Sequence, residues 1–205
     1  MPELLLTHGY FLYEDPKELQ IMKPYAPLGV LYICSHLRKQ GFDVEVFDTT
    51  FSTRELLFQH LRTETPSVLG IYANLMTRCN VVEIMKVARE AGWRVVVGGP
   101  EPGAYAQEYL DSGAEFVVFG EGEQTMQELL TAFRANVDIN ETGWHSKVAG
   151  VAYLDEAGNF HQNPPRMQIA DLDAQPMFLP ERSGLVTSLV QESHGGGGHQ
   201  AIDAE

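Results

Sequence analysis

The feature that most constrains the fold is a pattern that occurs three times: the end of a helical segment, a glycine, and then an apolar run. It reads KQGFDVEVF at 39–47, EAGWRVVVG at 90–98 and DSGAEFVVFG at 111–120. Glycine commonly ends helices, and continuous apolar runs are typical of strands that are buried on both faces. Three helix-to-strand units predict alternating strands and helices, which form a parallel sheet with right-handed crossovers.

The whole pattern predicts five strands and five helices in alternation. Strands are expected at 4–6, 43–47, 67–72, 95–97 and 116–119, and helices at 28–40, 54–62, 80–91, 104–112 and 124–133. A long connection, 11–27, separates the first strand from the first helix. We therefore expect an α/β fold with a flavodoxin-like, doubly wound sheet of five parallel strands in the order 2-1-3-4-5.

A different pattern follows the last helix. Two apolar runs, at 148–154 and 159–161, flank the turn sequence DEAG, which predicts a β-hairpin. This hairpin could extend the sheet or lead towards a following domain. We divide the chain into an α/β domain at 1–137, a hairpin and connecting segment at 138–175, and a tail at 176–205. The tail contains four consecutive glycines and is expected to be disordered.

Composition excludes several classes of partner and compartment. The formal net charge of -14 argues against nucleic acid and against anionic membrane surfaces. No basic, apolar leader and no apolar run of membrane-spanning length is apparent, which favours a soluble cytoplasmic protein. Cys34 and Cys79 lack the spacing of a metal site and indicate free thiols in a reducing compartment.

The expected topology places a ligand crevice between strands one and three, at their carboxyl ends. The loops there are 7–10 and 73–77, flanked by 98–101 and 120–123, and they are rich in glycine. Glycine allows the backbone to approach a ligand closely, although tight turns alone would also explain the glycines in these loops. Neither GxGxxG nor GxxxxGK[ST] occurs, so dinucleotide and P-loop sites lack their phosphate cradle. A phosphoacceptor aspartate is also missing, because strand three ends Tyr72-Ala73-Asn74.

Four segments together carry a family resemblance: PLGVLYICSHLRKQGFDVEVFD, GIYANLMTR, VVVGGPEP and VVFGEGE. In this order they resemble the N-terminal cobalamin-binding domain of cobalamin-dependent radical S-adenosylmethionine enzymes. The resemblance covers about residues 1–135, and the hairpin to about 175 is similar to that family's connecting segment. It implies a Rossmann-like domain whose crevice takes the nucleotide tail and the corrin edge of cobalamin (B12).

The resemblance also implies which residues contact the cofactor. Ala73-Asn74-Leu75 stands where such domains often have Ser-x-Leu beside dimethylbenzimidazole, and Gly98-Gly99 stands at the glycine pair that lets the tail pass. Gly70, inside a strand, leaves a gap that suits a flat group. The expected cofactor-binding residues are His8, Gly9, Tyr10, Gly70, Tyr72, Ala73, Asn74, Leu75, Met76, Thr77, Gly98, Gly99, Pro100, Glu101, Gly120, Glu121, Gly122 and Glu123.

Two departures from related proteins affect the chemistry. The Asp-x-His-x-x-Gly motif that supplies a lower cobalt ligand is absent, which leaves His8 as a candidate axial ligand and Tyr10 as a candidate cover for the lower corrin face. The CxxxCxxC motif is absent as well, and two cysteines cannot hold a [4Fe-4S] cluster. The cluster and S-adenosylmethionine would therefore belong to a missing catalytic domain or to a partner protein.

Two other hypotheses stay open at this stage. Flavodoxin-like crevices also accept other planar cofactors, such as flavin or haem. Alternatively, the chain is a fragment that binds no cofactor and acts through protein contacts. The hypothesis that the family resemblance favours is a cobalamin-binding module without catalysis of its own.

Overall fold

A single sheet runs through the molecule. The computed structural model describes residues 2–24, 26–135 and 143–166, so the predicted tail at 176–205 lies outside it. In these residues the sheet has seven strands in the order β2-β1-β3-β4-β5-β6-β7. The strands are β1 (Leu4–His8), β2 (Val44–Phe47), β3 (Val68–Tyr72), β4 (Arg94–Gly98), β5 (Phe116–Val118), β6 (Val151–Leu154) and β7 (Phe160–Gln162).

The predicted number of five strands is wrong, because the hairpin joins the same sheet. The first five strands are parallel and follow the order 2-1-3-4-5. The strands β6 and β7 extend this sheet in antiparallel fashion. Outside the ladder, the Phe119 N–H donates to the Gly150 carbonyl at 2.9 Å. An unpaired β5 would present an open edge, and the hairpin covers it. The result is an α/β fold with a mixed sheet.

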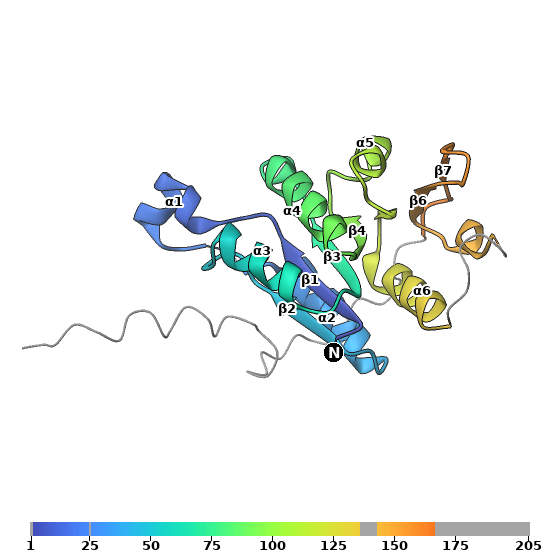
Figure 1. Cartoon of the computed structure of the whole chain (residues 1–205), viewed down its shortest axis with the longest axis horizontal. Helices are drawn as coiled ribbons and strands as arrows, with labels where there is room; N and C mark the ends of the chain where they lie inside the picture. The colour runs from blue at the N-terminus through green and yellow to red at the C-terminus, as the bar shows by residue number, and fades with distance from the viewer. Residues whose placement is uncertain (1, 25, 136–142, 167–205) are drawn as a thin grey trace, which may run out of the picture.

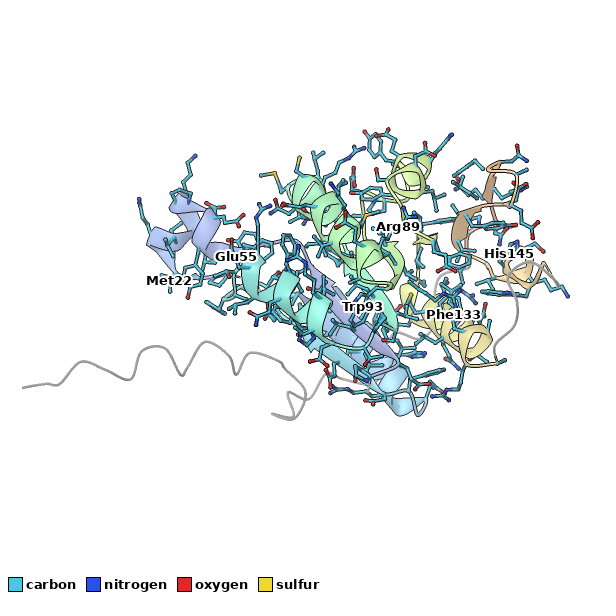
Figure 2. The ribbon with its side chains drawn as sticks, in the orientation of Figure 1. Met22, Glu55, Arg89, Trp93, Phe133 and His145 are labelled. Carbon is cyan, nitrogen blue, oxygen red and sulfur yellow. The ribbon has the colours of Figure 1, made fainter. Side chains whose placement is uncertain are left out.

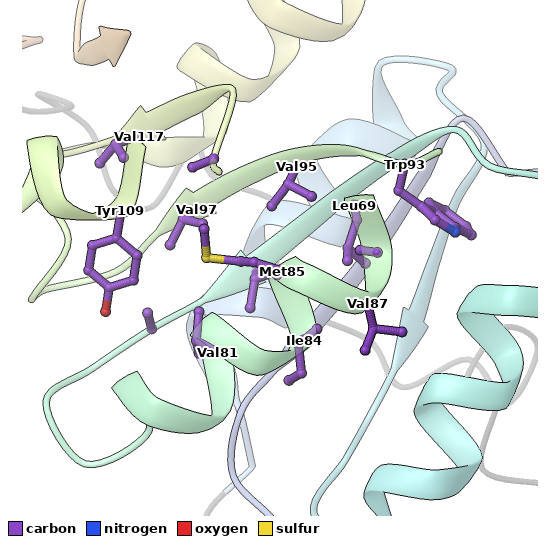
Figure 3. Close-up of a cluster of buried hydrophobic side chains, with 14 of the residues drawn as sticks. Leu69, Val81, Ile84, Met85, Val87, Trp93, Val95, Val97, Tyr109 and Val117 are labelled. Atoms are coloured by element: carbon purple, nitrogen blue, oxygen red, sulfur yellow. The ribbon is translucent and has the colours of Figure 1, made fainter. Parts of the chain in front are cut away.

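The helices cover both faces of the sheet (Figure 1). On one face, α2 (Leu28–Lys39) and α6 (Gly122–Arg134) pack on a cluster that includes Leu4, Val44 and Phe116. On the other, α3 (Arg54–Thr63), α4 (Arg78–Glu90) and α5 (Ala106–Asp111) pack on a second cluster. Figure 3 shows part of this second cluster, where Ile84 and Met85 of α4 lie over the apolar strands. Two buried clusters explain why the strand sequences are continuously apolar.

The repeated glycines end helices, as predicted. Gly41, Gly92 and Gly113 follow α2, α4 and α5, and their φ angles are +83°, +91° and +112°. A left-handed residue at this position turns the chain out of the helix and towards the next strand, and glycine adopts it without strain. The glycine in each repeat is therefore required by the left-handed backbone conformation at the end of the helix.

The connection at 11–27 contains local structure that sequence reasoning missed. It forms a short 3-10 helix, η1 (Leu12–Glu14), and the helix α1 (Pro16–Ile21). Asp15 caps α1, since its Oδ1 accepts the N–H groups of Lys17 and Glu18, each at 3.1 Å. The Asp-Pro pair is a helix-start signal that could have revealed α1.

α1 buries none of its residues. It lies at the opposite end of the molecule from β6 and β7 (Figure 1). Figure 2 shows Met22, the residue that follows α1, far from His145, which belongs to the 3-10 helix η2 (Trp144–Lys147). Within the described ranges, no helix has both the length and the hydropathy that crossing a bilayer requires.

Candidate functional site

A slot opens at the carboxyl ends of the parallel strands, between α2, α6 and the sheet. Its volume is about 200 Å³. Six of its residues are glycines that come from strands, loops and helices around the opening. The lining consists of Leu6, Gly29, Val30, Ile33, Gly70, Ile71, Tyr72, Val96, Gly98, Gly99, Val118, Gly120, Glu121, Gly122, Glu123 and Met126.

The register of the sheet creates the hollow. Gly70 lies between its neighbours Leu6 and Val96 on adjacent strands. Two residues further along the strands, and thus on the same face of the sheet, Gly98 lies between Tyr72 and Val118. In both places a residue without a side chain is flanked by large ones, and all six line the slot. The hollow therefore lies over a part of the sheet where two strand positions carry no side chain.

The glycines are closely fitted to their surroundings. A Cβ atom placed on Gly70 would lie 2.6 Å from Cδ2 of Leu6, whose side chain leans over the glycine. On the helices, a Cβ on Gly29 would lie 3.6 Å from the Tyr72 ring, and one on Gly122 would lie 3.2 Å from Cδ1 of Ile33. Side chains at Gly29 and Gly122 would extend across the mouth, so the small residues keep it open.

Polarity changes along the slot. Val30, Val96, Val118 and Met126 are buried. Half-buried Glu121 and Glu123 stand at the mouth, where α6 begins. Carboxylates are favoured at a helix start, and they also offer hydrogen-bond acceptors to a ligand. The site thus combines an apolar interior with a polar rim, which suits a flat apolar group on a polar arm.

Gly99 serves the fold directly. Its φ is +121°, and a Cβ there would lie 2.2 Å from the Ala73 carbonyl oxygen. The Ala73 N–H donates to the Gly98 carbonyl at 2.8 Å, so the loops after β3 and β4 cross with their backbones in contact. The glycine pair was expected to let a cofactor tail pass, and in the structure Gly99 also allows this crossing.

The loop after β3 is organised by Asn74. Its Oδ1 accepts the N–H groups of Met76 at 3.0 Å and Thr77 at 3.1 Å, so the side chain is engaged within the loop. Leu75 and Met76 are 71% and 89% exposed. Two consecutive large apolar side chains are therefore exposed to solvent at the carboxyl ends of the parallel strands.

His8 belongs to a buried polar network rather than to the slot. It is 4% exposed, its Nε2 lies 2.9 Å from Oδ1 of Asp48, and its Nδ1 accepts the Tyr10 N–H at 3.2 Å. Burial raises the pKa of Asp48, but the hydrogen bonds from His8 and Thr50 outweigh it and hold that pKa below its usual value. Both nitrogens of the imidazole are thus engaged within the protein.

Glu101 is likewise held by protein groups. It is 8% exposed, and it accepts hydrogen bonds from the Tyr109 hydroxyl and from Nη1 of Arg78, the latter at 3.1 Å. Burial, together with this carboxylate, raises the pKa of Tyr109 well above its usual value. The guanidinium of Arg78 also lies 4.9 Å from the centre of the Tyr105 ring. This cluster ties the loop after β4 to α4 and α5.

Eight of the predicted residues meet at the slot: Gly70, Tyr72, Gly98, Gly99, Gly120, Glu121, Gly122 and Glu123. The other ten do not line it: His8, Gly9, Tyr10, Ala73, Asn74, Leu75, Met76, Thr77, Pro100 and Glu101. Gly9 is packed against α4, since a Cβ there would lie 2.8 Å from Cγ2 of Val81.

Sequence reasoning missed eight lining residues: Leu6, Gly29, Val30, Ile33, Ile71, Val96, Val118 and Met126. Gly29 carried a signal, because a glycine in the first turn of an otherwise apolar helix weakens that helix and calls for another reason. The remaining seven are apolar and resemble ordinary core residues in the sequence. Only the register and the helix packing reveal that they face a hollow.

Comparison with known proteins agrees with this geometry. Residues 21–130 match the family described as the B12 binding domain. The hopanoid C-3 methylase of Methylococcus capsulatus is 30% identical to this chain over 122 residues, which are 55% of this chain and 23% of that protein. The chain thus spans less than a quarter of this relative's length. Because the family match covers more than half of the chain and includes most of the slot, the protein belongs to the B12-binding domain family.

Proposed function

We propose that the chain binds cobalamin by taking the dimethylbenzimidazole of its nucleotide tail into the slot between α2 and α6. The observation that carries this proposal is the slot over Gly70 and Gly98, two strand glycines that are each flanked by larger residues on the adjacent strands. An apolar cavity of roughly 150 Å³ accepts a benzene-sized ring. A slot of about 200 Å³ with a mostly apolar lining therefore fits a bicyclic apolar base.

The rim matches the rest of the ligand. The carboxylates of Glu121 and Glu123 would accept hydrogen bonds from ribose hydroxyls outside the apolar interior. Exposed Leu75 and Met76 would provide apolar contact for the corrin. A base held in the slot is separated from cobalt, so the protein would bind the cofactor in its base-off form. His8 remains a predicted cobalt ligand, and ligation would require one of its ring nitrogens to give up its protein contacts, Asp48 at Nε2 or Tyr10 and Thr49 at Nδ1.

We also propose that this module presents cobalamin to a radical S-adenosylmethionine catalytic domain. The four sequence segments and the match to a relative named as a methylase support this context. In such enzymes the cobalt centre passes a methyl group or assists radical chemistry. Cys34 and Cys79 are too few for the cluster, so the chain alone, reconstituted with iron and sulfide, is expected to leave S-adenosylmethionine intact. Its reductive cleavage would contradict this assignment.

The cobalamin site can be tested with a blocking variant and a matched control. Gly29→Leu places a side chain beside Tyr72 at the mouth, where a Cβ meets only ordinary contacts. Lys39→Leu adds the same side chain at the exposed end of the same helix. Visible absorption during titration with hydroxocobalamin should show saturable conversion to the base-off spectrum for the natural chain and for Lys39→Leu. For Gly29→Leu, affinity should fall at least tenfold with an unchanged circular dichroism spectrum.

The same titration separates the rival functions. Unchanged affinity in Gly29→Leu would place the nucleotide tail elsewhere. Absence of any spectral change with cobalamin, combined with saturable binding of flavin or haem, would instead favour another planar cofactor. Failure to bind all three would favour a protein that acts through contacts with other proteins.

A further inference from the structure

We propose that the slot selects among cobamides by the chemistry of their lower base and favours an apolar benzimidazole over a purine. This inference rests on the proposed function, because it concerns the same slot. It is carried by the distribution of polar groups: the carboxylates of Glu121 and Glu123 stand at the half-buried mouth, and the buried lining consists of apolar side chains.

The order of groups in the ligand determines which part reaches the interior. In a cobamide the base is the last group of the nucleotide tail, after the phosphate and ribose. A tail that enters from the mouth therefore places the base deepest, against Val30, Val96, Val118 and Met126. The ribose remains within reach of the polar rim. The interior of the slot is thus the part of the protein that contacts the base and can distinguish one base from another.

The interior offers few partners for a polar base. The N–H and C=O groups of β3 and β4 are used in the parallel ladders that join β1, β3, β4 and β5. Adenine adds two ring nitrogens and an exocyclic amine to the five-membered ring that it shares with benzimidazole. These groups would lose water without gaining a protein partner. Dimethylbenzimidazole carries methyl groups and aromatic C–H at the corresponding edge, which match apolar walls.

Two residues on opposite walls are the specificity-determining positions. Met126 of α6 is 3% exposed and lies one turn inside the mouth. Ile33 of α2 is half-buried, lines the slot and packs beside Gly122 of α6. Neither side chain can donate or accept a strong hydrogen bond. Glutamine at either position would supply both a donor and an acceptor to a purine edge.

The experiment measures dissociation constants of the full chain by equilibrium dialysis with three probes: cyanocobalamin, the cyano form of the adenine-containing cobamide, and dicyanocobinamide, which lacks the nucleotide. We expect cobalamin to bind roughly 10- to 100-fold more tightly than the adenine cobamide, the range expected for unpaired polar groups in an apolar site. Cobinamide should bind more weakly than cobalamin, because it leaves the slot empty.

Variants test the residues directly. Met126→Gln should reduce the preference for cobalamin over the adenine cobamide at least fivefold, and Ile33→Gln should do the same from a less buried position if the first variant fails to fold. Met126→Leu, which keeps the wall apolar, should retain the preference. Val82→Gln adds the same amide on the exposed side of α4 and should also retain it.

The outcomes distinguish this inference from the proposed function. Equal affinity for the two complete cobamides, with weaker binding of cobinamide, would overturn the selectivity and keep the tail in the slot. Equal affinity for all three probes would show that the nucleotide tail does not bind in the slot. Failure to bind any corrinoid would overturn the proposed function itself. An unchanged preference for cobalamin over the adenine cobamide in well-folded Met126→Gln and Ile33→Gln would show that other residues determine the base specificity.

Discussion

Gly98 and Gly99 are adjacent at the end of β4, and the fold depends on them to different degrees. Gly98 has room for a Cβ, which would lie 3.6 Å from the Val118 carbonyl oxygen and 3.8 Å from its Cβ. Gly99 has a φ that is nearly restricted to glycine, and a Cβ would collide with the backbone of Ala73. A glycine pair in a sequence motif thus contains one residue that the backbone requires and one that mainly leaves space.

Alanine substitutions should separate these two requirements. Gly99→Ala is expected to lower the free energy of unfolding by an amount at or above the upper end of the roughly 1–3 kcal/mol that such backbone strain costs. Gly98→Ala, the matched control, should change it by less than about 1 kcal/mol. Urea unfolding followed by circular dichroism gives both values. Equal losses in the two variants would mean that the crossing with Ala73 does not constrain Gly99.

At the scale of elements, the rings of two histidines pack against a tyrosine of the C-terminal hairpin. The ring of Tyr153 on β6 lies 4.2 Å from that of His145 and 5.3 Å from that of His161, measured between centroids. The Nε2 of His161 lies 2.8 Å from Oδ2 of Asp155 in the turn. The buried Nδ1 of His145 has no hydrogen-bond partner among the described residues. Burial, and secondarily the neighbouring His161, lower the pKa of His145.

This arrangement predicts a pH dependence of stability. A histidine whose pKa is lower in the folded state binds its proton more readily after unfolding, so folding is weakened as pH falls. The contribution should be fully present above pH 6.5, the ordinary histidine value, and should decline as pH drops from there towards the lower folded-state pKa. We expect the melting temperature to fall between pH 7.5 and 5.5. His145→Phe, which keeps an aromatic ring and removes the titration, should show a smaller fall.

Other groups also titrate in this range, so the difference between the two proteins is the relevant quantity. His161→Phe serves as a comparison, because the ring of His161 is more exposed and is paired with Asp155. An identical pH dependence for the natural chain and for His145→Phe would show that the His145 ring does not couple folding to protonation.

For the whole molecule, ligand binding should stabilise the fold, because the slot is built from both helices of one face and four strands of the sheet. A ligand at one hundred times its dissociation constant adds about 2.7 kcal/mol to stability when it binds only the folded state. For a chain of this size, each kcal/mol corresponds to about 2–4 °C. We therefore expect hydroxocobalamin to raise the melting temperature by about 5–10 °C.

Differential scanning calorimetry with and without cobalamin measures this shift. Gly29→Leu should melt near the temperature of the unliganded natural chain and should gain little from the ligand. Lys39→Leu should gain as much as the natural chain does. A full ligand-induced shift in Gly29→Leu would contradict the position of the slot.

The amino-acid sequence by itself determined the alternation of strands and helices, the parallel order of the first five strands and the family. It did so because these properties depend on local patterns: apolar runs, helix-ending glycines such as Gly41, and four segments in a fixed order. It also indicated the glycines at 70, 98 and 122. Local patterns contain this information since each concerns residues close together in the chain.

Only the tertiary structure decided which residues share the slot and where the hairpin goes. Leu6, Gly70 and Val96 are far apart in the sequence and become neighbours through strand register. The hairpin joins β5 because that edge offers unpaired backbone groups, which the turn sequence alone does not reveal. His8 and Glu101, which the sequence suggests as cofactor contacts, are held in this structure by hydrogen bonds with Asp48 and Tyr109. These outcomes depend on contacts between distant segments, and such contacts form only when the whole sheet and its helices assemble.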